Sequence, residues 1–287
     1  MRTIFKQNGF PAINPLLTFN NAEKLRDRTI ELEERHLDML RSIQYASRIQ
    51  EAMLPSGKLL EKFFSDYFIL NKPKEIVSGD FYWMNKVGRK LIFTIADCTG
   101  HGVPGAFMSI LGIMLLDQIT GIYRVVQADH IINILRERVA QTINHNRNQE
   151  IMKEGLDLTL GVYDPDKQII QFSGALDRVY QIRNNSLEKI DRDQLNGSSH
   201  LDNDTPCEKH EIRVQSGDIF YLFTDGYPDQ FGGEKNKKFT LKRFQDLLMK
   251  IYHKKMVRQK QILEDTIMKW QGSIDQLDDI TVMGIRF

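Results

Sequence analysis

Acidic residues stand out at four places in the sequence, each beside the end or the start of an apolar segment. They are Asp80 in Val-Ser-Gly-Asp-Phe, Asp97 in Ile-Ala-Asp-Cys-Thr-Gly-His-Gly, Asp225 in Leu-Phe-Thr-Asp-Gly, and the pair Asp278-Asp279 before Ile-Thr-Val. A buried carboxylate is costly unless it is paired or binds a metal ion. If these carboxylates meet in one place they need a cation, and oxygen ligands favour hard ions such as Mg²⁺ or Mn²⁺. Two such ions can activate a water and neutralise a phosphoryl transition state.

Each of these motifs has a plainer interpretation when it is taken alone. Asp225 before a glycine is typical of a turn after a strand, Asp278-Asp279 of a solvated strand start, and Asp80 of a cap or a surface charge. The segment 97–106 argues for more, because it places two glycines and a Pro-Gly between a predicted strand and a predicted helix. That pattern predicts a tight turn of the size of a phosphate group.

Beyond residue 57 the sequence is typical of a mixed protein in which strands cluster and helices come in pairs. Segments rich in β-branched and aromatic residues, separated by Gly, Pro, Asn and Asp, predict strands at 66–71, 90–96, 157–163, 169–172, 179–183, 211–214, 219–223 and 280–287. Helical periodicity predicts helices at 104–122, 129–146, 241–254 and 257–271, and we expect loops at 184–209 and 232–238. This order indicates an α+β fold rather than a regular βαβ alternation.

The first 57 residues form a separate region in this prediction. We expect residues 1–21 to be irregular, because Pro11 and Pro15 discourage a helix, and Asn21 to cap the helix that follows. Residues 22–54 contain no Gly or Pro, are rich in helix formers, and would span ~50 Å as a helix. A narrow apolar stripe runs along it, made of Ile30, Leu37, Leu40, Ile43, Ala46, Ile49 and Met53. The stripe favours a two-helix contact, and hence a homodimer, over packing on the same chain, which is the alternative.

The composition excludes several classes of protein. The chain has 287 residues, 41% of them hydrophobic, and 39 basic against 38 acidic residues leave a net charge of +1. This balance gives no reason to expect a nucleic-acid partner. The two cysteines, Cys98 and Cys207, exclude a disulfide framework and a four-cysteine zinc site. Because the chain shows no unbroken apolar run of about 18 residues and no signal-peptide core, we expect a cytoplasmic protein without a membrane span.

Taken in order, the acidic motifs resemble those of the PPM (PP2C-type) metal-dependent protein phosphatases, and specifically the bacterial SpoIIE/RsbU-like branch. The resemblance covers about residues 66–287, and four motifs in family order are far more specific than one. They are Ser78-Gly79-Asp80-Phe81-Tyr82-Trp83, Ala96-Asp97-Cys98-Thr99-Gly100-His101-Gly102, Phe223-Thr224-Asp225-Gly226 and Asp278-Asp279-Ile280-Thr281.

The resemblance implies a phosphatase domain over residues 58–287, built as a sandwich of two antiparallel sheets flanked by helices. Residues 1–57 would form an irregular start and a long linker or coiled-coil helix of the signalling type. Two Mn²⁺ or Mg²⁺ ions would lie in a cleft at one end of the sandwich. By this resemblance, Asp97 would bridge both ions, the Cys98 carbonyl would bind one, and three carboxylates would complete the ligand set. These carboxylates would come from Asp80, Asp225 and Asp278, with Asp279 as the alternative to Asp278.

The reaction implied is hydrolysis of phosphoserine or phosphothreonine by a water that bridges the two ions, with no covalent phospho-enzyme. His101 would either protonate the leaving oxygen as a general acid or orient a metal ligand, and both interpretations stay open. Asp157 would hold a third, weaker metal or, as the favoured alternative, serve a structural or surface role. The sequence departs from the family at 174–179, where Gly-Ala-Leu-Asp-Arg-Val replaces a Gly-Ala-Asn/His-Asn-Pro-type turn. It also shows no equivalent, before Asp80, of the phosphate-binding arginine of eukaryotic members.

The resemblance further implies a phosphoprotein substrate, such as an anti-sigma antagonist-like protein of a partner-switching pathway. Only about 20 residues precede the predicted helix, which is too few for a folded sensor. We therefore expect either that the input comes from a separate sensor or regulator protein, or that the chain is a fragment or a degenerate member of the family. The main alternative is a catalytically silent scaffold, against which the filled aspartate positions argue. A two-metal nucleotidyl cyclase or phosphodiesterase is a third hypothesis. Gly232-Gly233-Glu234 superficially resembles the cyclase signature, but Lys235-Asn236 follow it, and we discount it.

Overall fold

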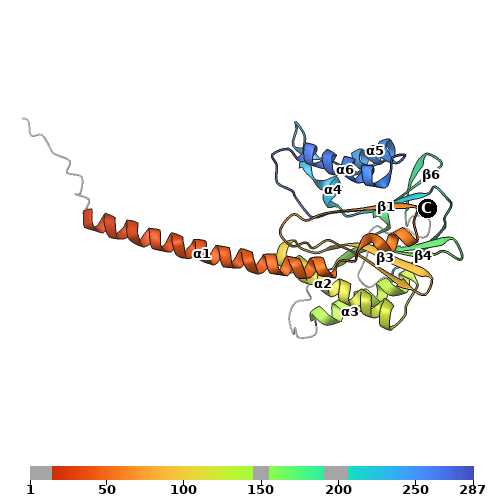
Figure 1. Cartoon of the computed structure of the whole chain (residues 1–287), viewed down its shortest axis with the longest axis horizontal. Coiled ribbons are helices and arrows are strands. Elements are labelled where there is room, and N and C mark those ends of the chain that lie inside the picture. Colours follow the sequence, from red (N-terminus) through yellow and green to blue (C-terminus); the bar gives the residue numbers. More distant parts are fainter. Residues whose placement is uncertain (1–14, 145–154, 191–205) are drawn as a thin grey trace, which may run out of the picture. The chain divides into compact units, whose positions relative to one another are not determined.

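The computed structural model describes residues 15–144, 155–190 and 206–287, with side chains from Lys24 onward (Figure 1). Its contacts divide the chain into two compact units, Met1–Tyr45 and Ala46–Phe287. The second unit contains all of the acidic motifs. The predicted domain boundary at residue 57 stays a prediction.

The first helix, α1, runs from Pro15 to Met53 and begins earlier than the sequence predicted. The expectation of an irregular segment up to residue 21, capped by Asn21, is therefore wrong from Pro15 onward. Proline is suited to the first position of a helix, because its φ angle is already helical. The N–H group that it lacks would have no acceptor within the helix at that position. Along α1, Ile30 and Leu37 of the predicted apolar stripe are 46% and 52% exposed.

Two five-stranded antiparallel sheets form the frame of the second unit, which confirms the predicted α+β fold. The strands are β1 Asp66–Lys72, β2 Phe81–Val87, β3 Lys90–Cys98, β4 Leu156–Asp164, β5 Ile169–Gly174, β6 Val179–Arg183, β7 Ser186–Lys189, β8 His210–Arg213, β9 Ile219–Phe223, β10 Phe231–Gly232, β11 Lys237–Lys238 and β12 Ile280–Arg286. One sheet has the order β1-β12-β9-β6-β7 and the other β2-β3-β4-β5-β8, while β10 and β11 form a small separate pair.

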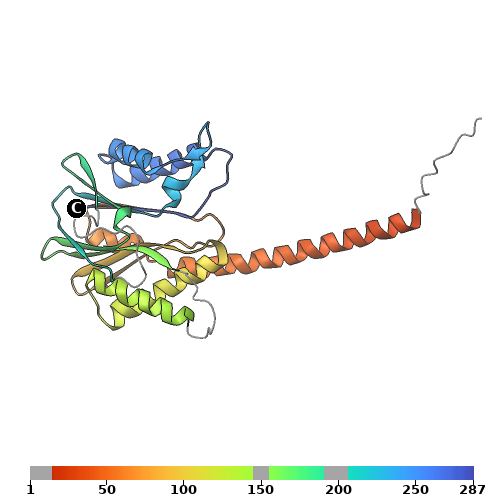
Figure 2. The ribbon, with the colours of Figure 1, turned by 180° about the vertical axis from the view of Figure 1, so that it is seen from behind.

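Helices cover the outer face of each sheet. They are α2 Gly102–Asp117, which continues into a π-helical turn at Gln118–Ile122, α3 Ala128–Asn144, α4 Gly226–Asp229, α5 Leu241–Ile251 and α6 Met256–Gln271, with short 3₁₀ turns at Gly57–Lys62 and Leu176–Arg178. The helices α2 and α3 lie on one side of the paired sheets, and α5 and α6 lie on the other (Figure 1). The view from behind shows the same arrangement (Figure 2).

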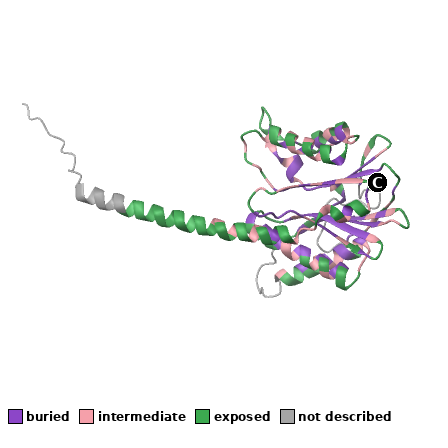
Figure 3. Cartoon of the chain, in the orientation of Figure 1, coloured by how far each residue is buried: buried purple, intermediate pink, exposed green. Residues whose placement is uncertain are grey.

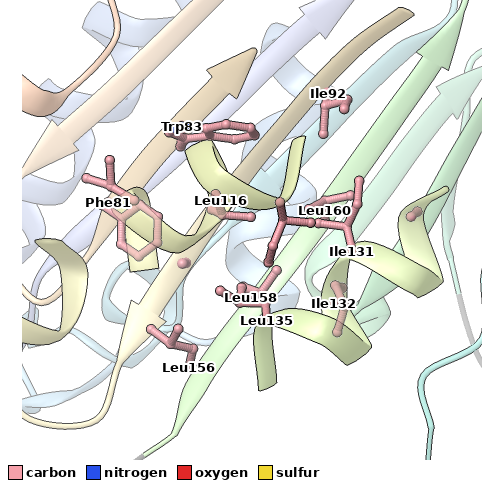
Figure 4. Close-up of a cluster of buried hydrophobic side chains, with 14 of the residues drawn as sticks. Phe81, Trp83, Ile92, Leu116, Ile131, Ile132, Leu135, Leu156, Leu158 and Leu160 are labelled. Carbon is pink, nitrogen blue, oxygen red and sulfur yellow. The ribbon is translucent and has the colours of Figure 1, made fainter. Parts of the chain in front are cut away.

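Three hydrophobic clusters hold these layers together, and the strands of both sheets are largely buried (Figure 3). Between the sheets, Phe93 and Phe172 of one sheet pack with Phe220 of the other. Under α2 and α3, side chains such as Phe81, Leu160, Leu116 and Ile131 interdigitate (Figure 4). Under α5 and α6, Tyr221 and Ile280 pack with Phe244 and Leu263. Among the described residues, the stretch Gly102–Ile122 is long and apolar enough to cross a membrane, and half of it is buried within the protein, as in a core helix.

Four strands were missing from the prediction: β2, β7 and the two-residue strands β10 and β11, so the expected loop at 232–238 is wrong at Gly232 and at Lys237–Lys238. The strand β2 does not alternate between apolar and polar residues, because Trp83 and Met84 are both buried although they lie on opposite faces of the strand. The strand β7 lies in the predicted loop 184–209, where Asn184 and Asn185 have φ angles of 49° and 61°. Two consecutive residues in the left-handed region form the turn that suits a tight hairpin, and asparagine tolerates that region well. The expectation of a loop is therefore wrong at 186–189, and residues 191–205 lie outside the described part.

The sheet register brings the four acidic motifs to one end of the sandwich. In one sheet, the start of β2 pairs with the end of β3, with Phe81 opposite Ala96. In the other sheet, the end of β9 pairs with the start of β12, with Phe223 opposite Val282. Each pair of strands thus delivers two of the motifs to the same edge of its sheet.

Candidate active site

A cluster of carboxylates surrounds a single guanidinium group at this end of the sandwich. Asp97 on β3 lies directly opposite Asp157 on β4, and Asp225 follows β9. The Nη1 atom of Arg178 lies 3.1 Å from Oδ2 of Asp97, and its Nη2 atom lies 3.0 Å from Oδ2 of Asp157 and 3.1 Å from Oδ2 of Asp225. Like charges opposite each other on neighbouring strands repel, so the guanidinium stabilises this pairing.

The cluster carries more negative charge than Arg178 neutralises. Burial, followed by the charge of Asp225, raises the pKa of Asp97 to about 7, although the nearby Arg178 acts in the opposite direction. Burial also raises the pKa of Asp225, and the charge of Asp278 adds to the effect. The pKa of Asp80 is raised well above its ordinary value by burial and then by the charge of Asp97. Together these shifts indicate a site that favours additional positive charge.

Asp80 is held by hydrogen bonds that join three of the motifs. The Thr224 hydroxyl donates to Oδ2 of Asp80 over 2.6 Å and accepts a hydrogen bond from the Thr281 amide over 2.9 Å. The Asp80 side chain is almost fully buried, and its residue is only 4% exposed. Thr224 therefore fixes Asp80, which precedes a strand of one sheet, against the paired β9 and β12 of the other.

The neighbouring residues Asp278 and Asp279 have different surroundings. The two carboxylate oxygens of Asp279 accept hydrogen bonds from the backbone amides of Lys74 and Gly79, each over 2.7 Å, and the residue is 3% exposed. The charge of Asp278 acts on Asp97 and Asp225, whereas the charge of Asp279 acts on Asp80. Asp278 thus lies near Asp97 and Asp225, while Asp279 lies near Asp80 and anchors the segment that leads to it.

Glycines allow the motif backbones to approach closely. A Cβ atom on Gly226 would overlap the backbone carbonyl of Asp279, so the Asp-Gly sequence serves the packing of two motifs and not only a turn. A Cβ atom on Gly79 would lie 2.7 Å from the Gly100 carbonyl oxygen and 3.3 Å from that of Cys98. The Cys98 carbonyl therefore lies next to the Asp80 segment. Burial, and then the charge of Asp80, raises the pKa of the Cys98 thiol, which disfavours a nucleophilic thiolate.

His101 lies at the exposed rim of this region. Its Nδ1 atom is 2.7 Å from Oε1 of Glu75, and both side chains are about half exposed. The structure thus pairs His101 with Glu75 rather than with one of the predicted metal ligands. The role of His101 as a general acid or as an orienting group stays a prediction.

The donor set fits a hard divalent cation, although its present arrangement is not that of a metal site. Across residues 15–144, 155–190 and 206–287, no group of three or more His, Cys, Asp or Glu side chains is arranged so that it could hold a metal ion. The donors that converge are carboxylate oxygens, with uncompensated negative charge, which is the chemistry that Mg²⁺ and Mn²⁺ prefer. The Arg178 guanidinium occupies the space between Asp97 and Asp225.

The sequence predicted that the aspartates lie in one site, but it did not predict the contacts that Arg178, Glu75 and Thr224 make there. Arg178 lies in the segment 174–179, whose departure from the family turn was the available signal. Its contact with Asp97 depends on the placement of β6 and β3 in different sheets, which no local pattern reveals. Thr224 immediately precedes Asp225, and its bond to Asp80 depends on the same packing of the two sheets.

Comparisons with known proteins agree with this architecture. The family described as Stage II sporulation protein E (SpoIIE) matches residues 88–287. The SiaA-PP2C domain of Pseudomonas aeruginosa superposes with a TM-score of 0.76 at 28% identity, over 88% of this chain and 98% of that chain. The PP2C phosphatase domain of SpoIIE from Bacillus subtilis, solved with a regulatory fragment, gives 0.60 at 19% identity, over 77% and 63%. The catalytic domain of the phosphatase PstP, in complex with two manganese ions, gives 0.53 at 14% identity, over 77% and 96%.

A search among curated proteins finds no match for the sequence. The family assignment therefore depends on the match over residues 88–287 and on the structural likeness to the SiaA-PP2C domain. The family match covers three of the four acidic motifs, all but the one at Asp80. The chain belongs to the SpoIIE family and contains a phosphatase domain of the PP2C type.

Proposed function

We propose that this chain is a metal-dependent phosphoprotein phosphatase that hydrolyses phosphoserine and phosphothreonine in bacterial signalling. The observation that carries the proposal is the convergence of four carboxylates, from motifs of both sheets, in a cluster with excess negative charge. These are Asp80, Asp97, Asp225 and Asp278. PstP, a phosphatase of the same fold, is in complex with two manganese ions, which supports manganese as the first metal to test.

In this proposal the carboxylates of Asp80, Asp97, Asp225 and Asp278 and the Cys98 carbonyl hold Mn²⁺ or Mg²⁺. The bound ions supply an activated water and neutralise the phosphoryl transition state. Asp279 keeps the preceding segment in place through the amides of Lys74 and Gly79.

The remaining polar groups position these ligands and the substrate. Thr224 holds one oxygen of Asp80, which leaves the other oxygen for a ligand role. His101, oriented by Glu75 at the rim, delivers a proton to the leaving seryl or threonyl oxygen. This assignment needs the Nε2 side of the ring to face the substrate, because Glu75 engages Nδ1.

The direct test is phosphate release from p-nitrophenyl phosphate by the purified chain, with and without Mn²⁺. We expect no hydrolysis after the metal is stripped, and recovery when Mn²⁺ or Mg²⁺ is added. Full activity in an excess of chelator would contradict the metal mechanism.

A catalytically silent scaffold is the second candidate, and one observation favours it. Arg178 already neutralises part of the cluster, and a cation built into the chain could replace metal ions altogether. In that case the chain would bind its partner without hydrolysis. The absence of phosphate release with every divalent metal tested, from a chain shown to be folded, would support the scaffold over the phosphatase.

We further propose a cytoplasmic homodimer joined through α1, with a phosphoprotein substrate of the anti-sigma antagonist type and a separate regulator. The support for dimerisation is the apolar stripe, of which Ile30, Leu37 and Ile49 are each more than two fifths exposed. A parallel pair of helices would cover these side chains. The last turns of α1 also contact the site region, since Gln50 is hydrogen-bonded to both the amide and the carbonyl of Ser78, over 3.0 and 2.6 Å.

A further inference from the structure

Arg178 occupies a position that the proposed metal ions also need. Its side chain is 17% exposed, and its two terminal nitrogens contact Asp97, Asp157 and Asp225. Two of these carboxylates, Asp97 and Asp225, belong to the proposed ligand set. We propose that Arg178 is an internal competitor for divalent cations, which neutralises the cluster in the metal-free protein and must leave Asp97 and Asp225 before the ions bind. This inference depends on the proposed metal site.

Arg178 and the ions would need the same two carboxylate oxygens. The guanidinium nitrogens lie 3.1 Å from Oδ2 of Asp97 and 3.1 Å from Oδ2 of Asp225. A bound Mg²⁺ lies about 2.1 Å from its ligand oxygens, inside that distance, and its charge repels the guanidinium. Asp97, as a bridging ligand, would use both of its oxygens. The ions and Arg178 would therefore compete for the same oxygens, because their positive charges repel each other at this distance.

Asp157 can keep the guanidinium of Arg178 paired when Asp97 and Asp225 bind metal. Asp157 is not part of the proposed ligand set, its side chain is 49% exposed, and it contacts the same Nη2 atom as Asp225. A guanidinium that keeps Asp157 while it releases the other two carboxylates stays paired. This matters because a largely buried charge that loses every partner is strongly destabilising. The exchange therefore replaces two ion pairs with metal coordination and leaves the third intact.

Competition of this kind lowers the apparent metal affinity. The measured dissociation constant equals the intrinsic value divided by the fraction of molecules in which the ligands are released. If Arg178 is released in about one molecule in ten, removal of the guanidinium tightens apparent binding about tenfold. The change in the apparent dissociation constant thus measures how strongly Arg178 competes with the metal for these carboxylates.

The test is Mn²⁺ binding, measured from the electron paramagnetic resonance signal of free Mn²⁺ and without any activity assay. We compare the wild-type chain with Arg178→Gln, which keeps much of the side-chain length, and with Arg178→Ala. The matched control is Arg89→Ala, which removes the same charge from an exposed arginine paired with Asp166. We expect about tenfold tighter binding in both Arg178 variants and a change of less than about twofold in the control.

A second readout guards against misfolding of the variants. In the metal-free state, Arg178→Gln should unfold at a lower temperature than the wild type, because three carboxylates lose their cation. Addition of Mn²⁺ should raise the unfolding temperature more in this variant than in the wild type. An equal rise in both proteins would show that Arg178 does not compete with the metal, and would overturn the inference.

The outcomes separate this inference from the proposed function. Asp225→Asn serves as the test of the site itself and should weaken Mn²⁺ binding in every background. If binding depends on Asp225 but is unchanged or weaker in the Arg178 variants, the metal site stands and the competition is wrong. If neither the wild type nor the Arg178 variants bind Mn²⁺ through Asp225, both the proposed metal site and this inference fail.

Discussion

Asp278 and Asp279 are adjacent in the sequence and yet have separate tasks in the structure. One oxygen of Asp279 accepts from Lys74 and the other from Gly79, so its carboxylate is fully engaged with the backbone. Asp278 is less buried, and its charge acts on Asp97 and Asp225. The sequence left open which of the two would bind metal, and these surroundings favour Asp278.

Asparagine substitutions should distinguish the two tasks. Asp279→Asn keeps one acceptor oxygen but places an NH₂ group against a backbone N–H, which costs about 1–3 kcal/mol and lowers the unfolding temperature by several degrees. Asp278→Asn should leave that temperature nearly unchanged and weaken Mn²⁺ binding. Thermal unfolding and a Mn²⁺ titration measure the two effects. The reverse pattern would assign the ligand role to Asp279.

The two possible roles of His101 can be distinguished by comparing hydrolysis rates for substrates with different leaving groups. If His101 is the general acid, His101→Gln should slow hydrolysis of a phosphoserine peptide by about a hundredfold and barely affect p-nitrophenyl phosphate, whose leaving group needs no proton. Glu75→Gln should show the same preference with a smaller loss, because Glu75 contacts Nδ1 of the ring. Equal losses on both substrates would indicate instead that His101 orients a metal ligand.

At the scale of elements, the site depends on where strands begin and end rather than on their interiors. Asp80 precedes β2 and Asp279 precedes β12, while Asp97 is the penultimate residue of β3. Antiparallel pairing within each sheet puts these ends together, and Thr224 joins the two sheets through its bond to Asp80. Glycine at position 226 is needed because the Asp279 carbonyl occupies the space of a side chain. The four family motifs therefore lie at those places in the sequence where the pairing of the strands brings their ends together.

The helix α1 is the element through which a second copy would act. We expect Leu40→Glu to make the protein monomeric, because it places a charge in the apolar stripe of a parallel helix pair. Ser42→Glu is the matched control, since it adds the same charge at an exposed polar position on the opposite face of the helix from Leu40. Sedimentation equilibrium measures the association.

The same variant tests whether α1 influences the site. Gln50, in the last turns of α1, holds Ser78, which lies two residues before Asp80. A monomer with an altered apparent Mn²⁺ affinity would support transmission along this route. If Leu40→Glu stays dimeric, or becomes monomeric with an unchanged metal requirement, α1 does not control the site.

At the scale of the whole molecule, local patterns predicted most of the elements, and the family resemblance correctly predicted their arrangement as two antiparallel sheets flanked by helices. The strands β6 and β9 have the bounds predicted from their runs of β-branched and aromatic residues. The strand β2 was missed because Trp83 and Met84 are both buried on opposite faces, which removes the alternation of apolar and polar residues. The start of α1 was missed because proline interrupts a helix interior but is also suited to the first helical position. The acidic cluster was predicted from family motifs. Arg178 was not, because its contact to Asp97 spans two sheets whose order depends on tertiary packing.

The central claim is that the converging aspartates make a metal-dependent phosphatase, and Asp97 is its most direct test. We measure the initial rate of phosphate release from a phosphoserine peptide as a function of Mn²⁺, for the wild type, Asp97→Asn and the exposed control Asp166→Asn. Loss of groups that merely support a metal ligand costs about 10–100-fold, so loss of Asp97 should cost more than about a hundredfold. Asp97→Asn should remain folded, and the control should match the wild type. Wild-type rates in Asp97→Asn, or rates that do not depend on Mn²⁺, would contradict the account.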